Sequence, residues 1–188
     1  MRFLLMVLVG CGGTKNISDD SGGLGQERGA AKRDHYPFPS MHMIDNGHVK
    51  LPTDLPIAEG GTPVPVDKLS WREGFSVVQS VVIDMDVDVD PASLPAQSSP
   101  ETLGSVQLWD LTSGEPILSF TEVDAAERIE GEHPSLIIRP QEVMTPGHQI
   151  AAVVTERVLT DSGEPIDTIP WYRDLLANTP GPGLSEWT

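Results

Sequence analysis

The chain has 188 residues and a formal net charge of -16 at pH 7, from 28 acidic and 12 basic side chains. Such an acidic surface repels the phosphate backbones of nucleic acids, and we therefore expect no nucleic-acid partner. Aromatic residues make up only 5% of the chain, which also contains 18 glycines and 17 prolines, and this composition favours a turn-rich β protein over a helical bundle.

The N-terminus has the pattern of a bacterial export signal. Arg2 is followed by the apolar run FLLMVLV and then by Gly10 and Cys11, the single cysteine of the chain. The run is far shorter than the ~20 residues that span a bilayer, so the pattern predicts a signal peptide and no transmembrane helix. The sequence LVGC, ending at Cys11, resembles the lipobox of bacterial lipoproteins.

That resemblance implies that residues 1–11 are a lipoprotein signal peptide with a lipidated Cys11. In the family, the cysteine thiol is acylated, the peptide before it is removed, and several acyl chains on one residue give a stable membrane anchor. Gly12 in place of Asp resembles the outer-membrane sorting pattern, so we expect a chain anchored in the bacterial cell envelope, at the outer membrane. The alternative is an ordinary apolar N-terminus with a buried cysteine.

A linker and then a β domain are predicted after the signal peptide. Residues 12–34 are rich in Gly, Ser and Asp and nearly free of apolar side chains, so we predict a flexible linker. Residues 35–178 are expected to form one β domain with an irregular, proline-rich lead-in. Within that lead-in, Asn46-Gly47 predicts a tight turn and a short hairpin.

A first long strand is predicted at Phe75–Ile83, and it is followed by an alternating acidic run. Period two places four aspartates on one face of that run and apolar residues on the other. The aspartates are Asp84, Asp86, Asp88 and Asp90. Their spacing fails the EF-hand pattern, so we predict no metal site and a solvated face that discourages edge-to-edge association. The alternative is a single Ca²⁺ held by these four residues.

The rest of the domain alternates strand-like runs with turn signals. Strands are predicted at 105–111, 116–120, 135–140 and 148–155, and turns at 112–115, 146–147 and 160–165. Short strands with turns at this spacing are typical of a β-sandwich.

Two resemblances refine this fold class. The sequence LIIRPQEVMTPGHQIAAVVTERVLTDSGEPI, residues 136–166, resembles the bacterial Ig-like domains, with Ile150 in place of the family's aromatic after Pro-Gly. The order YPFPSM, EGFS, DVDPASLP, VQLWDLTSGEPI and LIIRP resembles the N-terminal domain of bacterial lipase-like (virulence-factor lipase) lipoproteins over residues 35–178. In that family an α/β-hydrolase domain with the catalytic residues follows. This chain stops at Thr188 without it, so no catalytic residue carries over.

The C-terminal residues complete the expected organisation. Residues 170–178 predict a short helix that begins at Pro170, and residues 179–188 predict a linker or truncated tail. The expected fold is therefore an all-β, Ig-like β-sandwich with an N-terminal signal, a tether and a short C-terminal helix.

The expected function is that of an exported, lipid-anchored module. We expect a non-catalytic spacer or interaction domain without cofactor, which is the N-terminal part of a larger lipase- or esterase-like protein and has a downstream α/β-hydrolase domain as its partner. One alternative is a small serine hydrolase, for which His133 and His148 are the available bases. The other is a surface module that binds calcium or carbohydrate through the aspartates or Trp109.

Overall fold

The computed structural model describes residues 3–10, 37–51, 65–98, 102–124 and 134–167. Within these residues the regular structure is antiparallel β-sheet with short 3-10 helices, which confirms the predicted all-β class. The strands are β1 (Phe3–Gly10), β2 (Ile44–Asp45), β3 (His48–Val49), β4 (Val81–Asp84), β5 (Val106–Asp110), β6 (Glu115–Ile117), β7 (Ser119–Val123), β8 (Ser135–Pro140) and β9 (Gln149–Thr155). The 3-10 helices are η2 (Met41–Met43), η3 (Val66–Lys68) and η4 (Pro91–Ser93).

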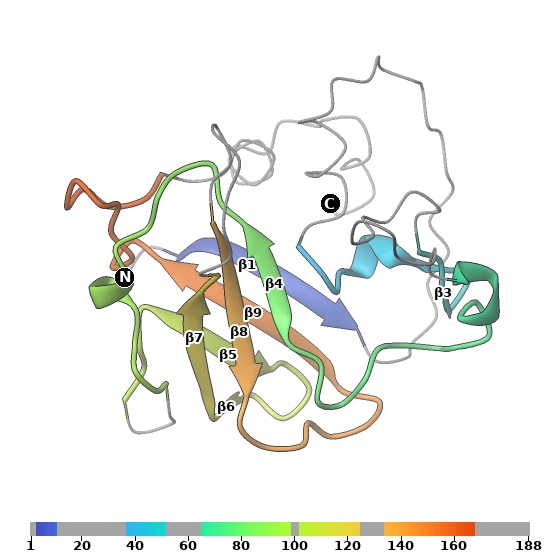
Figure 1. Ribbon diagram of the computed structural model, residues 1–188. Helices are drawn as coiled ribbons and strands as arrows, with labels where there is room; N and C mark the ends of the chain where they lie inside the picture. Colours follow the sequence, from blue (N-terminus) through green and yellow to red (C-terminus); the bar gives the residue numbers. More distant parts are fainter. Residues whose placement is uncertain (1–2, 11–36, 52–64, 99–101, 125–133, 168–188) are drawn as a thin grey trace, which may run out of the picture.

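Two larger sheets make up the body of the molecule. One sheet has the order β1-β9-β5-β6 and the other has the order β4-β8-β7, while β2 and β3 form a separate hairpin. The sheets lie against each other with their strands running in different directions (Figure 1). This two-layered arrangement is the coarse form of the predicted sandwich, and the assignment to the Ig-like family stays a prediction.

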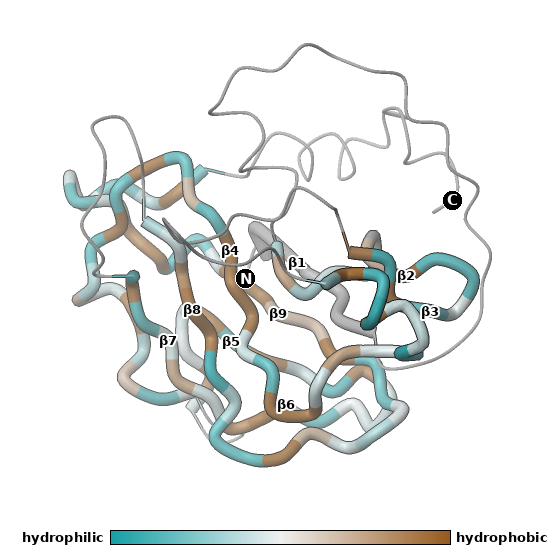
Figure 2. Tube along the Cα trace, turned by 45° about the vertical axis from the view of Figure 1, so that its right-hand side comes forward, coloured by the Kyte–Doolittle hydropathy of each residue, from teal (hydrophilic) through white to brown (hydrophobic). Residues whose placement is uncertain are grey.

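The hydrophobic core lies between these sheets. Successive side chains of a β-strand point to opposite faces of the sheet, so every second side chain of each strand points into the core. Those sets meet in one buried cluster whose main members are Val81, Ile83, Val106, Leu108, Leu136, Ile138, Ile150, Ala152 and Val154. Hydrophobic residues line β4 and β8, whereas the β2–β3 hairpin is largely hydrophilic (Figure 2). Each fully buried aliphatic side chain contributes about 1.5–3 kcal/mol, so this cluster is the main source of the domain's stability.

Several predicted turns are confirmed. Asn46 and Gly47 have φ values of 50° and 80°, and they join β2 to β3 in the expected hairpin. Gly114, between β5 and β6, has a φ of 77°. Glycine adopts this left-handed backbone conformation without the steric cost that a Cβ atom adds.

The predicted strand over Phe75–Ile83 is wrong in its first half. Only the residues from Val81 onward form β4. Before them the chain turns, because the Gln79 amide donates to the Ser76 carbonyl at 3.0 Å, and Val77 bonds through its carbonyl to the Met144 amide at 2.9 Å. Phe75 and Val77 pack against the core from this loop.

The predicted strand over 116–120 is divided between the two sheets. Its first part is the end of β6, and its second part starts β7 in the opposite sheet. The chain crosses at Leu118, whose amide donates to the Glu142 carboxylate at 3.0 Å. An apparently continuous strand therefore becomes the link that closes the core between the layers.

Several predicted features lie outside the described residues. They are Cys11, the linker 12–34, His133, the helix 170–178 and the tail 179–188. Residues 3–10 of the predicted signal peptide are described, and they form β1, which pairs antiparallel with β9 from Gly10↔Gln149 to Phe3↔Thr155. β1 lies at the edge of its sheet beside β9 (Figure 1).

Candidate functional site

A buried carboxylate with three hydrogen-bond partners, that of Asp110, ends β5. Its Oδ2 lies 2.6 Å from Nδ1 of His148, and its Oδ1 accepts the backbone amides of Thr112 at 2.9 Å and Ser113 at 3.1 Å. The Thr112 hydroxyl accepts the Gln149 amide at 3.0 Å. We call these five residues the Asp110 cluster.

Local sequence explains how this cluster forms. An Asp at the end of a strand accepts the amides two and three residues later and so begins a turn. Gly114 completes that turn by donating its amide to the Asp110 carbonyl at 2.8 Å. His148 follows the Pro146-Gly147 turn, and the Leu111 amide donates to the Gln149 carbonyl at 2.8 Å. The β5–β6 turn and the start of β9 are thereby held together.

The cluster keeps Asp110 ionised. Burial by itself raises the pKa of this carboxyl, but the hydrogen bond from His148, the Ser113 and Thr112 amides and the electrostatic interaction with His148 outweigh burial and lower the pKa below its ordinary value of 3.8. These donors favour the charged form because they bind a carboxylate more strongly than a carboxylic acid. At neutral pH the cluster therefore holds a carboxylate that is 7% exposed.

A carboxylate bonded to Nδ1 of a histidine also occurs in serine hydrolases, where it orients the imidazole that acts as the general base. Such chemistry requires a hydroxyl within about 2.6–3.2 Å of the other ring nitrogen. No hydroxyl in the described part of the chain is hydrogen-bonded to Nε2 of His148, and the Ser113 hydroxyl instead accepts the Glu115 amide at 3.4 Å. Among the described residues, the contact between Asp110 and His148 therefore joins a turn to a strand.

The predicted alternating strand through the four aspartates is wrong beyond Asp84, although Met85 and Val89 are buried as alternation predicted. β4 ends at Asp84, whose carboxylate accepts the Ser135 hydroxyl at 3.0 Å, and the chain then bends at residues 86–87. The bend leaves Val87 37% exposed, although alternation predicted an inward side chain. Asp90 instead caps η4 by accepting the Ala92 amide at 2.9 Å. Among the described residues, no group of three His, Cys, Asp or Glu side chains is placed to hold a metal ion.

No protein-family model, curated protein or solved structure matches this chain. The resemblances to lipoproteins, Ig-like domains and lipase-like proteins therefore stay predictions that rest on the residues quoted for them. Within the described ranges there is no helix of the length and apolar character that crossing a membrane requires.

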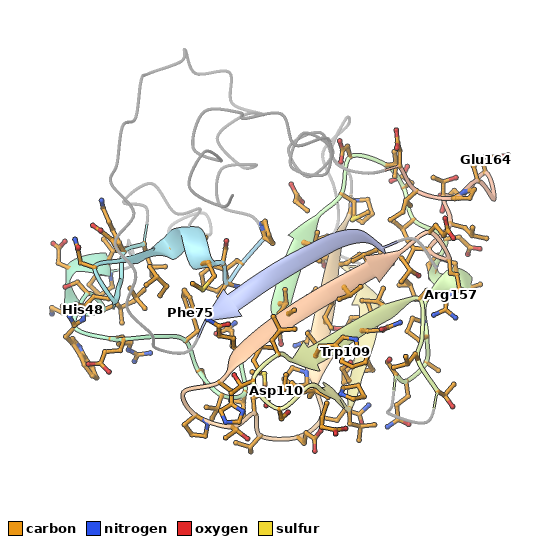
Figure 3. All side chains as sticks on the ribbon, turned by 180° about the vertical axis from the view of Figure 1, so that it is seen from behind. His48, Phe75, Trp109, Asp110, Arg157 and Glu164 are labelled. Carbon is orange, nitrogen blue, oxygen red and sulfur yellow. The ribbon has the colours of Figure 1, made fainter. Side chains whose placement is uncertain are left out.

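Trp109, the predicted exposed contact residue, is only partly exposed. It lies on the outer face of β5, opposite Ala151 of β9, and its Nε1 donates to the Gln107 side chain at 2.9 Å (Figure 3). The Gln107 amide group in turn donates to the Gly104 carbonyl at 2.9 Å. The indole is therefore held in place by the sheet, with part of its ring available to solvent.

Sequence reasoning missed two buried hydroxyls on β7. The side-chain oxygens of Ser119 and Thr121 are buried and have no hydrogen-bond partner. Phe120, which lies between them, is opposite Arg139 and is only partly buried. The inward direction of Thr121 follows from the partner strand, because Thr121 pairs with Ile138, a core residue.

Proposed function

We propose that this chain is an exported bacterial lipoprotein, held at the outer membrane by acyl chains on Cys11. In this proposal its Ig-like β domain is a non-catalytic spacer or interaction module. The observation that carries the proposal is the sequence LVGC at the end of the N-terminal apolar run, with Cys11 as the single cysteine of the chain. A thiol that follows a small residue at this position is the chemical requirement for lipid transfer and cleavage.

The position of β1 is compatible with the removal of residues 1–10. β1 is the edge strand of its sheet, so its loss leaves β9, β5 and β6 paired in their observed order.

We further infer, from the resemblance over residues 35–178, that the domain is the N-terminal part of a lipase-like protein. The expected partner is an α/β-hydrolase domain encoded downstream. Sequencing of the DNA beyond the codon for Thr188 tests this inference. A continued frame with a G-x-S-x-G nucleophile elbow supports it, and a stop codon at that position contradicts it.

Lipid labelling tests the anchor. The full chain is expressed in a Gram-negative host that is fed an alkyne-bearing palmitate, and label on the purified chain is measured by fluorophore coupling. We expect label on the wild type and on the control Asn16→Ala, and none on Cys11→Ala. Fractionation should place the wild type with the outer membrane. An unlabelled wild-type chain contradicts the proposal.

The Asp110–His148 contact is the one observation that favours the alternative, a small serine hydrolase. A fluorophosphonate probe, which reacts with activated serines, separates the two functions. The proposed module does not react. Labelling that is lost in His148→Ala, with the fold retained by circular dichroism, would replace the proposed function with hydrolysis.

A further inference from the structure

β9 is a sheet strand with no feature that blocks pairing at its outer edge. Its sequence, QIAAVVT, contains no charged residue and no proline. Native proteins protect strand edges with charges, prolines, bulges or covering segments, because an open edge pairs with other chains. In the described structure, the covering segment of β9 is β1.

Hydrogen bonds define which peptide groups of β9 face that edge. The Gln149 carbonyl accepts from Leu111 at 2.8 Å, and the Thr155 amide donates to Ser105 at 2.9 Å, so both groups point toward β5. Peptide groups alternate direction along an antiparallel strand. The N–H and C=O groups of Ile150, Ala152 and Val154 therefore point toward β1, and they need a partner there.

The other edges of the two larger sheets that remain once β1 is removed have their own protection. β6 is short and contains Glu115 and Pro116. The edge of β4 is bonded to Phe38, with distances of 2.8 and 2.7 Å to both backbone groups of Val82. The β7 edge is bonded to Ser98, which exchanges bonds of 2.7 and 3.0 Å with Ser119. Among the described residues, only the β9 edge depends on the segment that the proposed signal cleavage removes.

We propose that, once residues 1–10 have been removed, β9 pairs antiparallel with β9 of a second copy of this chain. This inference rests on the proposed function, because processing is what opens the edge. The pairing has a two-fold axis at Ala152, with Ile150 opposite the partner's Val154 and Ala151 opposite the partner's Val153. Two copies of a strand without charges can pair in this register, since no like charges are brought together across the two-fold axis.

The symmetric pairing joins two domains into one continuous sheet. Three strands from each copy, β6, β5 and β9, take part. Anchoring on the same membrane raises the effective concentration of the two copies, which favours a contact between them over capture of a dilute partner. The ladder bonds made by β1 are replaced by equivalent bonds to the second β9.

Two soluble forms with Cys11→Ser test this inference. One is the full chain 1–188, which retains β1, and the other is the mature chain 11–188, which is the form that the proposed processing produces. Sedimentation equilibrium should give about twice the monomer mass for the mature chain. Circular dichroism establishes that each form is folded.

Cysteine cross-linking tests the register. In the mature form, Ala152→Cys places two thiols across the axis at about 5.5 Å between Cα atoms, a separation that a disulfide spans. Val154→Cys is the matched control, because it lies on the same buried face and its two copies are about 14 Å apart. We expect a covalent dimer for Ala152→Cys alone, and none when the full chain carries the same substitution.

The outcomes separate the inference from the proposed function. A mature chain that is unfolded, that is monomeric, or that cross-links equally through both cysteines overturns the β9 pairing. A full chain that cross-links through Ala152→Cys as strongly as the mature chain also overturns it. Retention of residues 1–10 by the native chain contradicts the proposed processing, whatever the mature chain does.

Discussion

Nδ1 of His148 lies 2.6 Å from Oδ2 of Asp110, and this contact joins the residue before β9 to the residue that ends β5. The same carboxylate holds the turn into β6 through two backbone amides. One side chain therefore fixes the ends of three strands in the larger sheet. Its removal leaves several donors without their acceptor, which is costlier than loss of a single pair.

The first prediction concerns this carboxylate. Asp110→Ala is expected to lower the free energy of unfolding by about 1–3 kcal/mol, because the Thr112 and Ser113 amides and the His148 ring lose their acceptor. Urea denaturation measures the change. Asp86→Ala is the control, since Asp86 is exposed, and it should change stability by less than about 0.5 kcal/mol. Equal effects of the two substitutions would show that the cluster has no structural role.

The second prediction follows from the lowered pKa of Asp110. A carboxyl whose pKa in the folded state lies below its ordinary value of 3.8 stabilises the fold above that value, and this stabilisation is lost as the pH falls through the folded-state pKa. The stability difference between wild type and Asp110→Asn should therefore shrink as the pH falls from about 5 to below 3. Urea titrations across this range measure it. A difference that stays constant contradicts the ionised cluster.

The third prediction concerns the unpartnered hydroxyls on β7. Thr121→Val should raise the free energy of unfolding by about 1 kcal/mol, because a buried hydroxyl without a hydrogen bond is replaced by a methyl group.

Thr155→Val is the matched control for Thr121→Val. Thr155 is also buried, but its hydroxyl donates to the Ser105 carbonyl at 2.9 Å, so the same substitution should destabilise by about 1–3 kcal/mol. Thermal or urea unfolding of both variants measures whether each substitution raises or lowers the free energy of unfolding. Destabilisation by both would mean that the Thr121 hydroxyl has a bonding partner.

The fourth prediction concerns Gly104, where a Cβ atom would lie 2.5 Å from Cβ of Pro95. Such a separation forces the backbone to move, so Gly104→Ala should destabilise the domain by about 1–3 kcal/mol. Gly163→Ala is the comparison, because its Cβ would meet nothing within 4 Å although its φ is +82°. Only backbone strain of about 1 kcal/mol is expected there. Unfolding curves that coincide would contradict the close approach to Pro95.

Local signals in the sequence predicted the all-β class and the hairpin turns. They succeed because a left-handed glycine in a tight turn depends on a few neighbouring residues. The acidic strand face failed for a non-local reason, since the chain bends at residues 86–87 and Val89 then pairs with Thr160 and not with β8.

Contacts between distant residues also explain the features that sequence reasoning did not find. The crossing at Leu118 depends on Glu142, which lies 24 residues away, and the Asp110–His148 contact spans 38 residues. Alternation in one strand carries no information about such partners. An Asp at the end of a strand and a His after Pro-Gly were visible, but only the pairing of β5 with β9 brings them together.

The most direct test of the proposed function is the intact mass of the native chain purified from membranes of a Gram-negative host. The account predicts a chain that begins at Cys11, without residues 1–10, and that carries the added mass of acyl chains on that cysteine. A chain that retains Met1 and has a free Cys11 thiol would contradict it.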